Sequence, residues 1–198
     1  MAKIVPIAPG TLGPTQITVG MIEVADKKKE LTALKAPDQV SFLQAHVIPA
    51  VLGPNKRHFL TDHHHLGRAA LECGIAVVFC EVQDDLSSLA IGPFWDKMEE
   101  NAWVHPLDEH GTRHVYSKLP DHLEQLVDDV YRSLSGYVRN AGGYDKTFEA
   151  FSEFIWADFF RRNVAVELVT TDFARAVQAA IPLARSLRAK RLPGFKGS

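Results

Sequence analysis

The chain has few cysteines and no cysteine pair of the kind that binds zinc. Only Cys73 and Cys80 are cysteines among its 198 residues, and no C-x-x-C spacing occurs. A disulfide framework and a thiolate zinc site are therefore not indicated. Free cysteines behave as small apolar side chains, so we expect both of these to be buried.

Long apolar runs are also missing. No stretch approaches the roughly 18 apolar residues that mark a membrane-spanning helix. The first 13 residues contain one lysine and an apolar stretch that Pro6, Pro9 and Gly10 interrupt, which is too short and too broken for a signal peptide. We therefore expect a cytoplasmic protein without membrane contacts, although a chain trimmed of its leader would look the same.

Neither sign of charge dominates the sequence. It has 22 Lys and Arg residues against 24 Asp and Glu residues, a net charge of −2. Non-specific DNA affinity comes mainly from Lys and Arg side chains that neutralise phosphates, so strong non-specific DNA binding is not expected. With 46% hydrophobic and 23% charged residues, the composition is that of an ordinary globular chain; it indicates no oligomeric state.

The first half of the chain alternates between strand and helix patterns after a Pro/Gly-rich arm over residues 1–13. The apolar patterns and the turn signals predict strands and helices in the order strand, helix, hairpin, helix, strand. Their expected ranges are a strand over 16–24, a helix over 26–34, hairpin strands over 45–52 and 56–61, a helix over 62–73 and a strand over 75–82.

The second half has helical patterns from Asp85 onward. We expect helices over 86–101, 120–139, 148–162 and from about residue 172 to the basic residues near the end, with Pro182 kinking or splitting the last helix. A polar loop over 105–118 carries several histidines and is either a disordered loop or a flap over a site. The predicted division is an arm over 1–13, a domain over 14–85, a helical region over 86–192 and a tail over 193–198.

The best candidate for a functional site is the turn from the hairpin into the next helix. Three successive histidines, His63, His64 and His65, follow Asp62, which we expect to be the N-cap of the helix. A helix start offers unpaired N–H groups and the positive end of the helix dipole, which suit a phosphate. Consecutive helical residues point about 100° apart, so three histidines cannot share one core face.

A metal site is the competing interpretation of the same residues. Asp62, His58 and the three histidines are all ligand types, and Asp62-His63-His64 matches the DHH motif of manganese phosphoesterases. Those enzymes need an earlier Asp-x-Asp cluster, whereas only the isolated Asp26 and Asp38 lie upstream here. Adjacent histidines also point apart and rarely bind one ion together.

The element order and several segments together resemble the ParB/sulfiredoxin superfamily, and most closely its ParB-like nuclease family. The segments that carry the resemblance are 14–20 (PTQITVG), 56–74 (KRHFLTDHHHLGRAALECG), 131–146 (YRSLSGYVRNAGGYDK) and 156–161 (WADFFR). The resemblance implies an α+β fold: a small ParB/sulfiredoxin-like mixed sheet with helices, followed by a mainly α-helical C-terminal half.

The resemblance also implies nucleotide or phosphate binding at the histidine turn. In the free serine kinases of this superfamily an Asp-Gly-His-His-Arg motif occupies the turn; Asp62, His64 and His65 stand where that motif has its aspartate and histidines. Arg68 matches an arginine that often follows in ParB proteins. The kinase base is a glutamate just after the first strand, for which Glu23 is the nearest candidate, and Lys27 would reach phosphate from the same side.

Three departures from the superfamily patterns keep other functions open. His63 replaces the usual glycine of the turn, Leu66 replaces an arginine that would clamp a phosphate, and His64 stands where sulfiredoxin has its cysteine. Sulfiredoxin chemistry is therefore not expected. A metal-dependent nuclease and a non-catalytic nucleotide sensor remain as alternatives.

Our leading hypothesis is a nucleotide-dependent phosphoryl-transfer enzyme that resembles the free serine kinases. Its cofactor would be a nucleotide tri- or diphosphate with Mg²⁺, and its acceptor a small molecule with a hydroxyl group. The expected catalytic residues are Glu23, Asp62 and His64, with Asp62 also a metal ligand. The expected phosphate-binding residues are His63, His64, His65, Arg68 and Lys27.

Overall fold

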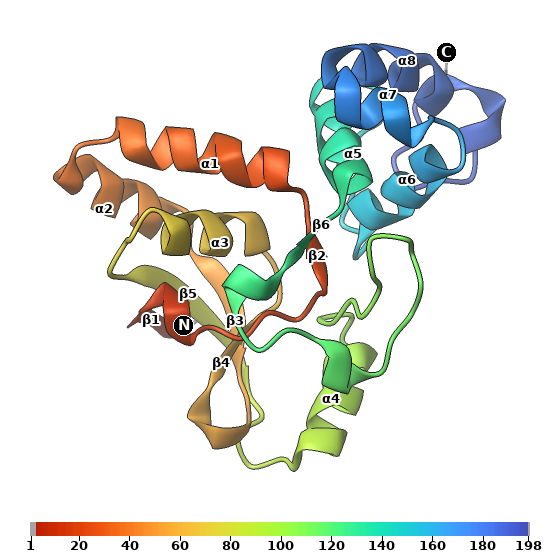
Figure 1. Cartoon of the computed structure of the whole chain (residues 1–198). Coiled ribbons are helices and arrows are strands. Elements are labelled where there is room, and N and C mark those ends of the chain that lie inside the picture. Colours follow the sequence, from red (N-terminus) through yellow and green to blue (C-terminus); the bar gives the residue numbers. More distant parts are fainter. Residues whose placement is uncertain (1–2, 198) are drawn as a thin grey trace. The chain divides into compact units, whose positions relative to one another are not determined.

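The computed structural model of the chain describes residues 3–197, which divide into two compact units. The first, here called the sheet unit, contains the residues up to 19 and residues 23–128. The second, the helical unit, contains residues 20–22 and the residues from 129 onward. Both units are drawn in Figure 1. The ends of the predicted arm and tail, residues 1–2 and 198, lie outside the described part.

A four-stranded mixed sheet forms the centre of the sheet unit. Its strand order is β1-β5-β3-β4, with β1 and β4 antiparallel to their neighbours and β3 parallel to β5. The strands are β1 (Lys3–Ile7), β3 (Ile48–Leu52), β4 (His58–Leu60) and β5 (Val78–Asp85). The predicted hairpin of β3 and β4 and the α+β class are thus confirmed.

Part of the predicted arm is instead the edge strand β1. Its Pro6 lies opposite Phe79 of β5. An edge strand tolerates a proline because the missing N–H group is not needed by a second neighbour. The prolines and the glycine of this segment therefore interrupted the sequence pattern without preventing a strand.

Three helices lie on one side of the sheet in Figure 1: α1 (Met21–Ala33), α2 (Ala36–Ala45) and α3 (His64–Glu72). The predicted strand over 16–24 is wrong for most of its length, because β2 covers only Thr18–Val19 and α1 begins directly after Gly20. The apolar, β-branched run predicted a strand, but in the structure its second part is the first turn of a helix.

The sheet unit extends well beyond the predicted boundary at residue 85. The helix α4 (Ile91–Glu100) packs Phe94 and Trp95 against Val51 and Phe59 of the hairpin. A further strand, β6 (Val127–Asp128), pairs in parallel with β2. The predicted helix over 120–139 is consequently wrong in its first half, where a short 3-10 helix, η4 (Leu123–Gln125), and β6 precede α5.

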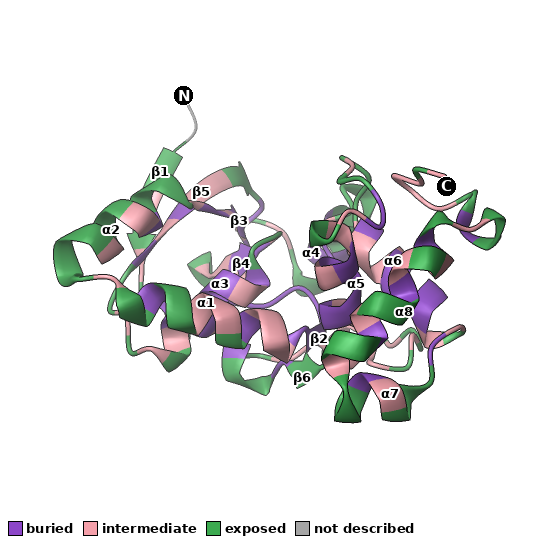
Figure 2. Cartoon of the chain, turned by 90° about the horizontal axis from the view of Figure 1, so that it is seen from above, coloured by how far each residue is buried: buried purple, intermediate pink, exposed green. Residues whose placement is uncertain are grey.

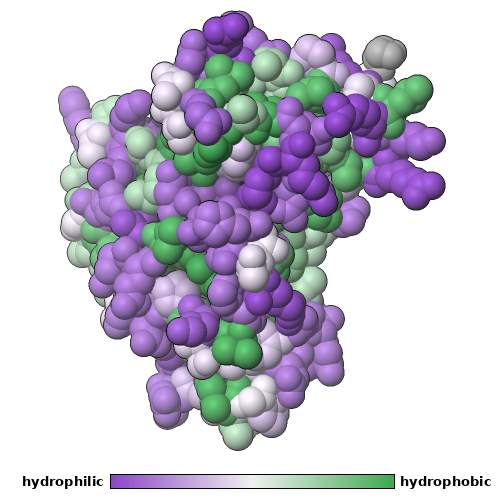
Figure 3. All heavy atoms as spheres, turned by 45° about the vertical axis from the view of Figure 1, so that its right-hand side comes forward, coloured by the Kyte–Doolittle hydropathy of each residue, from purple (hydrophilic) through white to green (hydrophobic). Residues whose placement is uncertain are grey.

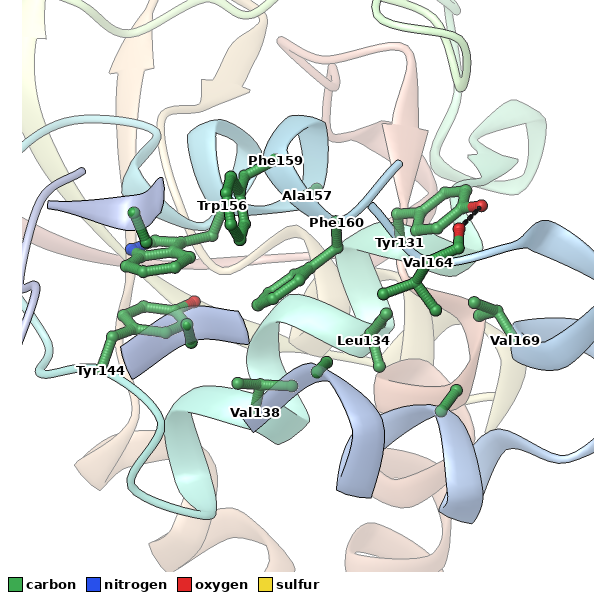
Figure 4. Packing of buried hydrophobic residues seen from close by; sticks show 14 residues of the cluster. Tyr131, Leu134, Val138, Tyr144, Trp156, Ala157, Phe159, Phe160, Val164 and Val169 are labelled. Carbon is green, nitrogen blue, oxygen red and sulfur yellow. Dashed lines mark hydrogen bonds between the residues drawn. The ribbon is translucent and has the colours of Figure 1, made fainter. Parts of the chain in front are cut away.

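The helical unit packs four helices around one aromatic core. They are α5 (Val130–Asn140), α6 (Ser152–Arg161), α7 (Val166–Thr171) and α8 (Phe173–Arg185). In this core the Trp156 ring stacks on Tyr144, with the ring centroids 4.1 Å apart, and Phe160 is fully buried. Figure 4 shows this cluster, and Figure 2 shows the buried faces of its helices in purple.

The C-terminal part of the helical unit differs from the prediction in two ways. The helix α8 starts as expected, with the Asp172 carboxylate accepting a hydrogen bond from Arg175 N–H, but it continues through Pro182 as one helix. The residues of the predicted tail also contact the unit, since Pro193 O accepts the indole N–H of Trp156. The tail is therefore packed rather than separate.

The described residues also bear on the expectations about membrane-spanning helices and about the two cysteines. No helix in this part of the chain is long and apolar enough to cross a membrane. The prediction that both cysteines are buried is confirmed for Cys80 and wrong for Cys73, which is partly exposed. Burial raises the pKa of the Cys80 thiol to about 12. The face drawn in Figure 3 is largely hydrophilic, with hydrophobic side chains in small patches.

The aromatic core of the helical unit predicts a contrast between two phenylalanines. Replacing the buried Phe160 by alanine leaves a cavity and should lower the free energy of unfolding by about 3–5 kcal/mol. The matched control is Phe148→Ala, since Phe148 is fully exposed; it should change stability by less than about 0.5 kcal/mol. Urea unfolding followed by tryptophan fluorescence measures both, and equal effects would contradict this packing.

Candidate phosphate-binding site

The turn between β4 and α3 has a left-handed residue at its centre. His63 has φ 59° and ψ 29°, and the helix begins at the next residue, with Gly67 N–H donating to His63 O at 3.0 Å. The predicted N-cap, Asp62, lies one residue earlier. Its carboxylate accepts the N–H of His63 at 2.7 Å, so it stabilises the turn rather than capping the helix.

The left-handed backbone of His63 explains how the turn tolerates the loss of the glycine that the resemblance predicts there. Glycine adopts this conformation without strain, whereas other L-residues pay about 1–2 kcal/mol. Histidine is among the side chains enriched in it. The chain thus keeps the turn geometry that a glycine would give and stores strain at it, which is common at binding and catalytic sites.

His64 points into the sheet unit and is only 4% exposed. Its Nε2 lies 3.1 Å from Thr15 N, and the Thr15 hydroxyl donates to Leu60 O at 2.6 Å. A backbone N–H can only donate, so Nε2 of His64 must be the acceptor and the ring proton lies on Nδ1. His64 therefore holds the first turn of α3 against the segment that contains Thr15.

His65 forms the second contact of the first turn, with a carboxylate from another helix. Its Nε2 lies 3.2 Å from Oε2 of Glu23, and the two side chains are 16% and 19% exposed. Glu23 is in the first turn of α1 rather than at a strand end. The structure thus brings together two of the predicted site residues in one partly buried acid–base pair.

Arg68 and Lys27 have other partners. The Arg68 guanidinium donates to Leu123 O at 2.7 Å and lies 2.5 Å from the Glu72 carboxylate. Lys27 pairs with Glu30 at 2.8 Å and its ammonium lies over the Phe42 ring. Both cations are therefore engaged in contacts within the sheet unit, and we do not count them among the phosphate-binding residues.

A chain of charges links α1 to α3 on this side of the unit. Lys28 Nζ lies 2.6 Å from the Glu72 carboxylate, which also forms an ion pair with Arg68. The hydrogen bond from Lys28 is the main cause that lowers the pKa of Glu72, and the contacts with Arg68 lower it further. Burial acts in the opposite direction, but the net effect is a lowered pKa. Glu72 is therefore the shared anion that holds the two helices together beside the Glu23–His65 pair.

The metal interpretation finds little support in the geometry. The described residues contain no group of three or more His, Cys, Asp or Glu side chains that could hold a metal ion. His58 lies in β4, where burial and then the charge of Lys3 lower its pKa. Asp62 is exposed. A single exposed carboxylate suits a Mg²⁺ ion that arrives with nucleotide phosphates rather than a resident metal centre.

The polar loop over 105–118 is ordered by its own hydrogen bonds. The Asp108 carboxylate accepts the backbone N–H groups of His110 and Thr112, and its other oxygen lies 2.7 Å from His114 Nε2. His105 N–H donates to Thr15 O at 2.8 Å. The structure therefore shows an ordered loop and not the disordered one. Its start is bonded to Thr15, which also bonds to His64.

Thr15 is the site residue that the sequence reasoning missed. It is 2% exposed and contacts His64, Leu60 and His105. The segment around it carries part of the resemblance to the family, but no local pattern distinguishes a threonine that bonds to a histidine 49 residues away. Only the tertiary structure shows its role.

Comparisons with known proteins identify one family and one similar solved structure. The family model described as "Putative ParB-like nuclease" matches residues 5–162. A crystal structure of protein Atu1540 from Agrobacterium tumefaciens is 38% identical, with a TM-score of 0.94, and the match covers 100% of this chain and 98% of that chain. The search of curated proteins finds no match.

The strained turn predicts an order of stability at position 63. Glycine relieves the left-handed conformation and alanine does not, so His63→Gly should be more stable than His63→Ala by about 1 kcal/mol. Thermal or urea unfolding of the two variants measures the difference. An alanine variant as stable as the glycine variant would show that the turn does not hold this conformation.

The lowered pKa of Glu72 predicts a pH-dependent stability. An acid whose pKa is lower in the folded state contributes stability above its unfolded pKa, and this contribution disappears as the pH falls through the folded pKa. The stability difference between the wild type and Glu72→Gln should therefore be present at about pH 7 and shrink towards about pH 3. The same difference at both pH values would contradict the ionised Glu72 as the link between α1 and α3.

Proposed function

We propose that this chain, which belongs to the ParB-like nuclease family, binds a nucleotide phosphate at the first turn of α3 and transfers a phosphoryl group to a small hydroxyl acceptor. The family model spans residues 5–162 and the matched relative is 38% identical over the whole chain.

The Glu23–His65 contact of 3.2 Å is the observation that carries the proposal. It places an acid–base pair at the first turn of a nine-residue helix, whose positive end favours a phosphate. A carboxylate that holds one imidazole nitrogen orients the ring and raises its basicity, which is how a general base is built in many enzymes.

In the proposed reaction the pair takes up the proton of the acceptor hydroxyl. Glu23 holds Nε2 of His65 and so orients the imidazole that acts as the base. As the acceptor oxygen bonds to phosphorus, the bond to the leaving nucleotide phosphate breaks. The residues mainly position the reactants and stabilise charge, as in other phosphoryl transfers.

The remaining predicted residues have supporting roles in this proposal. His64 is a positioning residue, because its Nε2 is bonded to Thr15. The exposed Asp62 is the residue that would hold Mg²⁺ brought by the nucleotide, and the ion would neutralise phosphate charge there. His63, exposed beside Asp62, would donate to the phosphate.

The distribution of charge favours a nucleotide over a polynucleotide as the ligand of this turn. Residues 1–128, which contain the turn, have 11 Lys and Arg against 17 Asp and Glu, whereas residues 129–198 have 11 against 7. A nuclease needs cations along a polynucleotide backbone, and the sequence around the proposed site is acidic. Metal-dependent nuclease activity, which the family description suggests, is therefore the second candidate.

A thermal-shift screen with site variants tests nucleotide binding. The ligands are ATP, ADP, CTP, GTP, pyrophosphate and sulfate, each with and without Mg²⁺. A ligand present at 100 times its Kd should add about 2.7 kcal/mol of stability. We expect one nucleotide to raise the Tm of the wild type. The His65→Ala variant should lose this shift, and the Glu23→Gln variant should show a smaller one.

A ³¹P NMR assay with hydroxyl acceptors tests turnover. In this assay Glu23→Gln should lower turnover about 100-fold or more, because the carboxylate that orients the base is lost.

Glu30→Gln is the matched control, because Glu30 lies on the same helix and pairs with Lys27 instead. It should behave as the wild type. If no nucleotide shifts the Tm of the wild type, nucleotide binding is wrong, and cleavage of single- and double-stranded DNA with divalent metals becomes the assay of choice. If a nucleotide binds without turnover, the chain is a nucleotide sensor rather than an enzyme.

A further inference from the structure

The C-terminal segment of the chain, residues 173–198, carries charge of one sign only. It contains six Lys and Arg residues and no Asp or Glu. The net charge of −2 conceals this segment, because the excess of acidic residues lies before residue 129. The basic residues are Arg175, Arg185, Arg188, Lys190, Arg191 and Lys196.

The end of α8 accounts for one of these cations. The helix ends at Arg185, where the helix dipole favours a cation, and the Arg185 guanidinium donates to Gly142 O at 2.9 Å. Arg188, Lys190 and Arg191 lie beyond the helix and are exposed. Within residues 3–197 these three side chains form no ion pair, so their charges are not needed by the fold.

Most acidic side chains of the helical unit are engaged elsewhere. They are Asp129 and Asp158, which bind Arg161, Glu153, which binds Arg139, Asp145, which binds Lys196, and Asp172, which caps α8. Glu149 and Glu167 remain, and they are too few to neutralise the basic segment.

The core of the helical unit holds the basic segment in place. Ala189 is fully buried, Leu192 N–H donates to Ala189 O at 2.9 Å, and the Trp156 indole donates to Pro193 O at 2.8 Å. The exposed cations on both sides of Ala189 are therefore presented on a fixed backbone. A surface that is already ordered loses little conformational freedom on binding, which favours affinity.

A fully exposed aromatic ring lies in the loop attached to this segment. Asp145 makes the attachment, since its N–H donates to Gly194 O at 2.8 Å and its carboxylate lies 2.9 Å from Lys196 Nζ. Phe148 follows in the same loop and is fully exposed. Cations beside an exposed aromatic ring suit a single-stranded nucleic acid, because phosphates meet the cations and bases stack on the ring.

We propose that the helical unit binds single-stranded nucleic acid at the surface formed by Arg188, Lys190, Arg191 and the loop of Phe148. Arginine, the commoner cation of the segment, binds phosphate with two parallel hydrogen bonds. An anionic membrane would instead need an extended apolar face. Among the described residues of the basic segment, Leu187 is the one large apolar side chain that is exposed.

This surface is suited to binding and not to cleavage. Residues 129–198 contain no histidine that could act as a general base, and the proposed phosphate site belongs to the sheet unit. Single-strand binding is therefore independent of what the first turn of α3 binds. Since few cations contribute, the binding should be strongest at low salt, which agrees with the expectation that strong non-specific DNA binding is absent.

The test titrates the full chain into a fluorescein-labelled oligothymidine of about 20 nucleotides, followed by anisotropy between about 50 and 200 mM salt. The triple variant Arg188→Gln/Lys190→Gln/Arg191→Gln should bind more weakly. It should also lower the slope of log K against log salt by about 2, because each phosphate contact on a single strand contributes about 0.7.

Two further variants separate charge from stacking. Lys29→Gln/Lys35→Gln/Lys97→Gln is the matched control, because it removes the same charge from exposed residues of the sheet unit; it should keep the affinity and the slope of the wild type. Phe148→Ala changes no charge and should weaken binding about 5-fold or more at an unchanged slope.

Three outcomes would overturn the proposal. The first is a wild type that does not bind the oligonucleotide at about 50 mM salt, or an equal loss in the two triple variants. The second is a duplex bound more tightly than the single strand, with no effect of Phe148→Ala. The third is binding to vesicles of phosphatidylserine and phosphatidylcholine, lost in the Arg188/Lys190/Arg191 variant, by a protein that does not bind the oligonucleotide; this result would assign the surface to a membrane.

Discussion

The buried Thr15 is the constraint on which the candidate site depends. Its N–H donates to His64 Nε2 at 3.1 Å, its hydroxyl donates to Leu60 O at 2.6 Å and its carbonyl accepts His105 N–H at 2.8 Å. One residue thereby ties together the end of β4, the start of α3 and the loop after α4. A buried polar group without a partner is costly, so the loss of any one of these three bonds would destabilise this part of the sheet unit.

The three adjacent histidines have three different surroundings, because His63 precedes α3 with a left-handed backbone and the first two residues of the helix point about 100° apart. His64 points inward to Thr15, His65 meets Glu23, and His63 is exposed with a left-handed backbone. The strain of the turn is maintained by the contacts on both sides of it. This division of tasks explains why a run of identical side chains is not redundant and why it occurs at the start of α3.

The sequence patterns predicted the locally encoded features and missed those set by distant contacts. The hairpin, α3 and the family were predicted because alternation, helical spacing and a short motif carry them. The pairing of β2 with β6 and the bond between Thr15 and His64 join residues far apart in the chain, so no local pattern reveals them. The resemblance points to Glu23, although this residue lies in the first turn of a helix and not at the end of a strand.

A crystal structure of the chain grown with ATP and Mg²⁺ would test the central claim most directly. The account predicts phosphate oxygens at the first turn of α3, beside Asp62 and the Glu23–His65 pair, with His64 still bonded to Thr15. A nucleotide bound elsewhere, or a phosphate at this turn that does not contact His65, would contradict it.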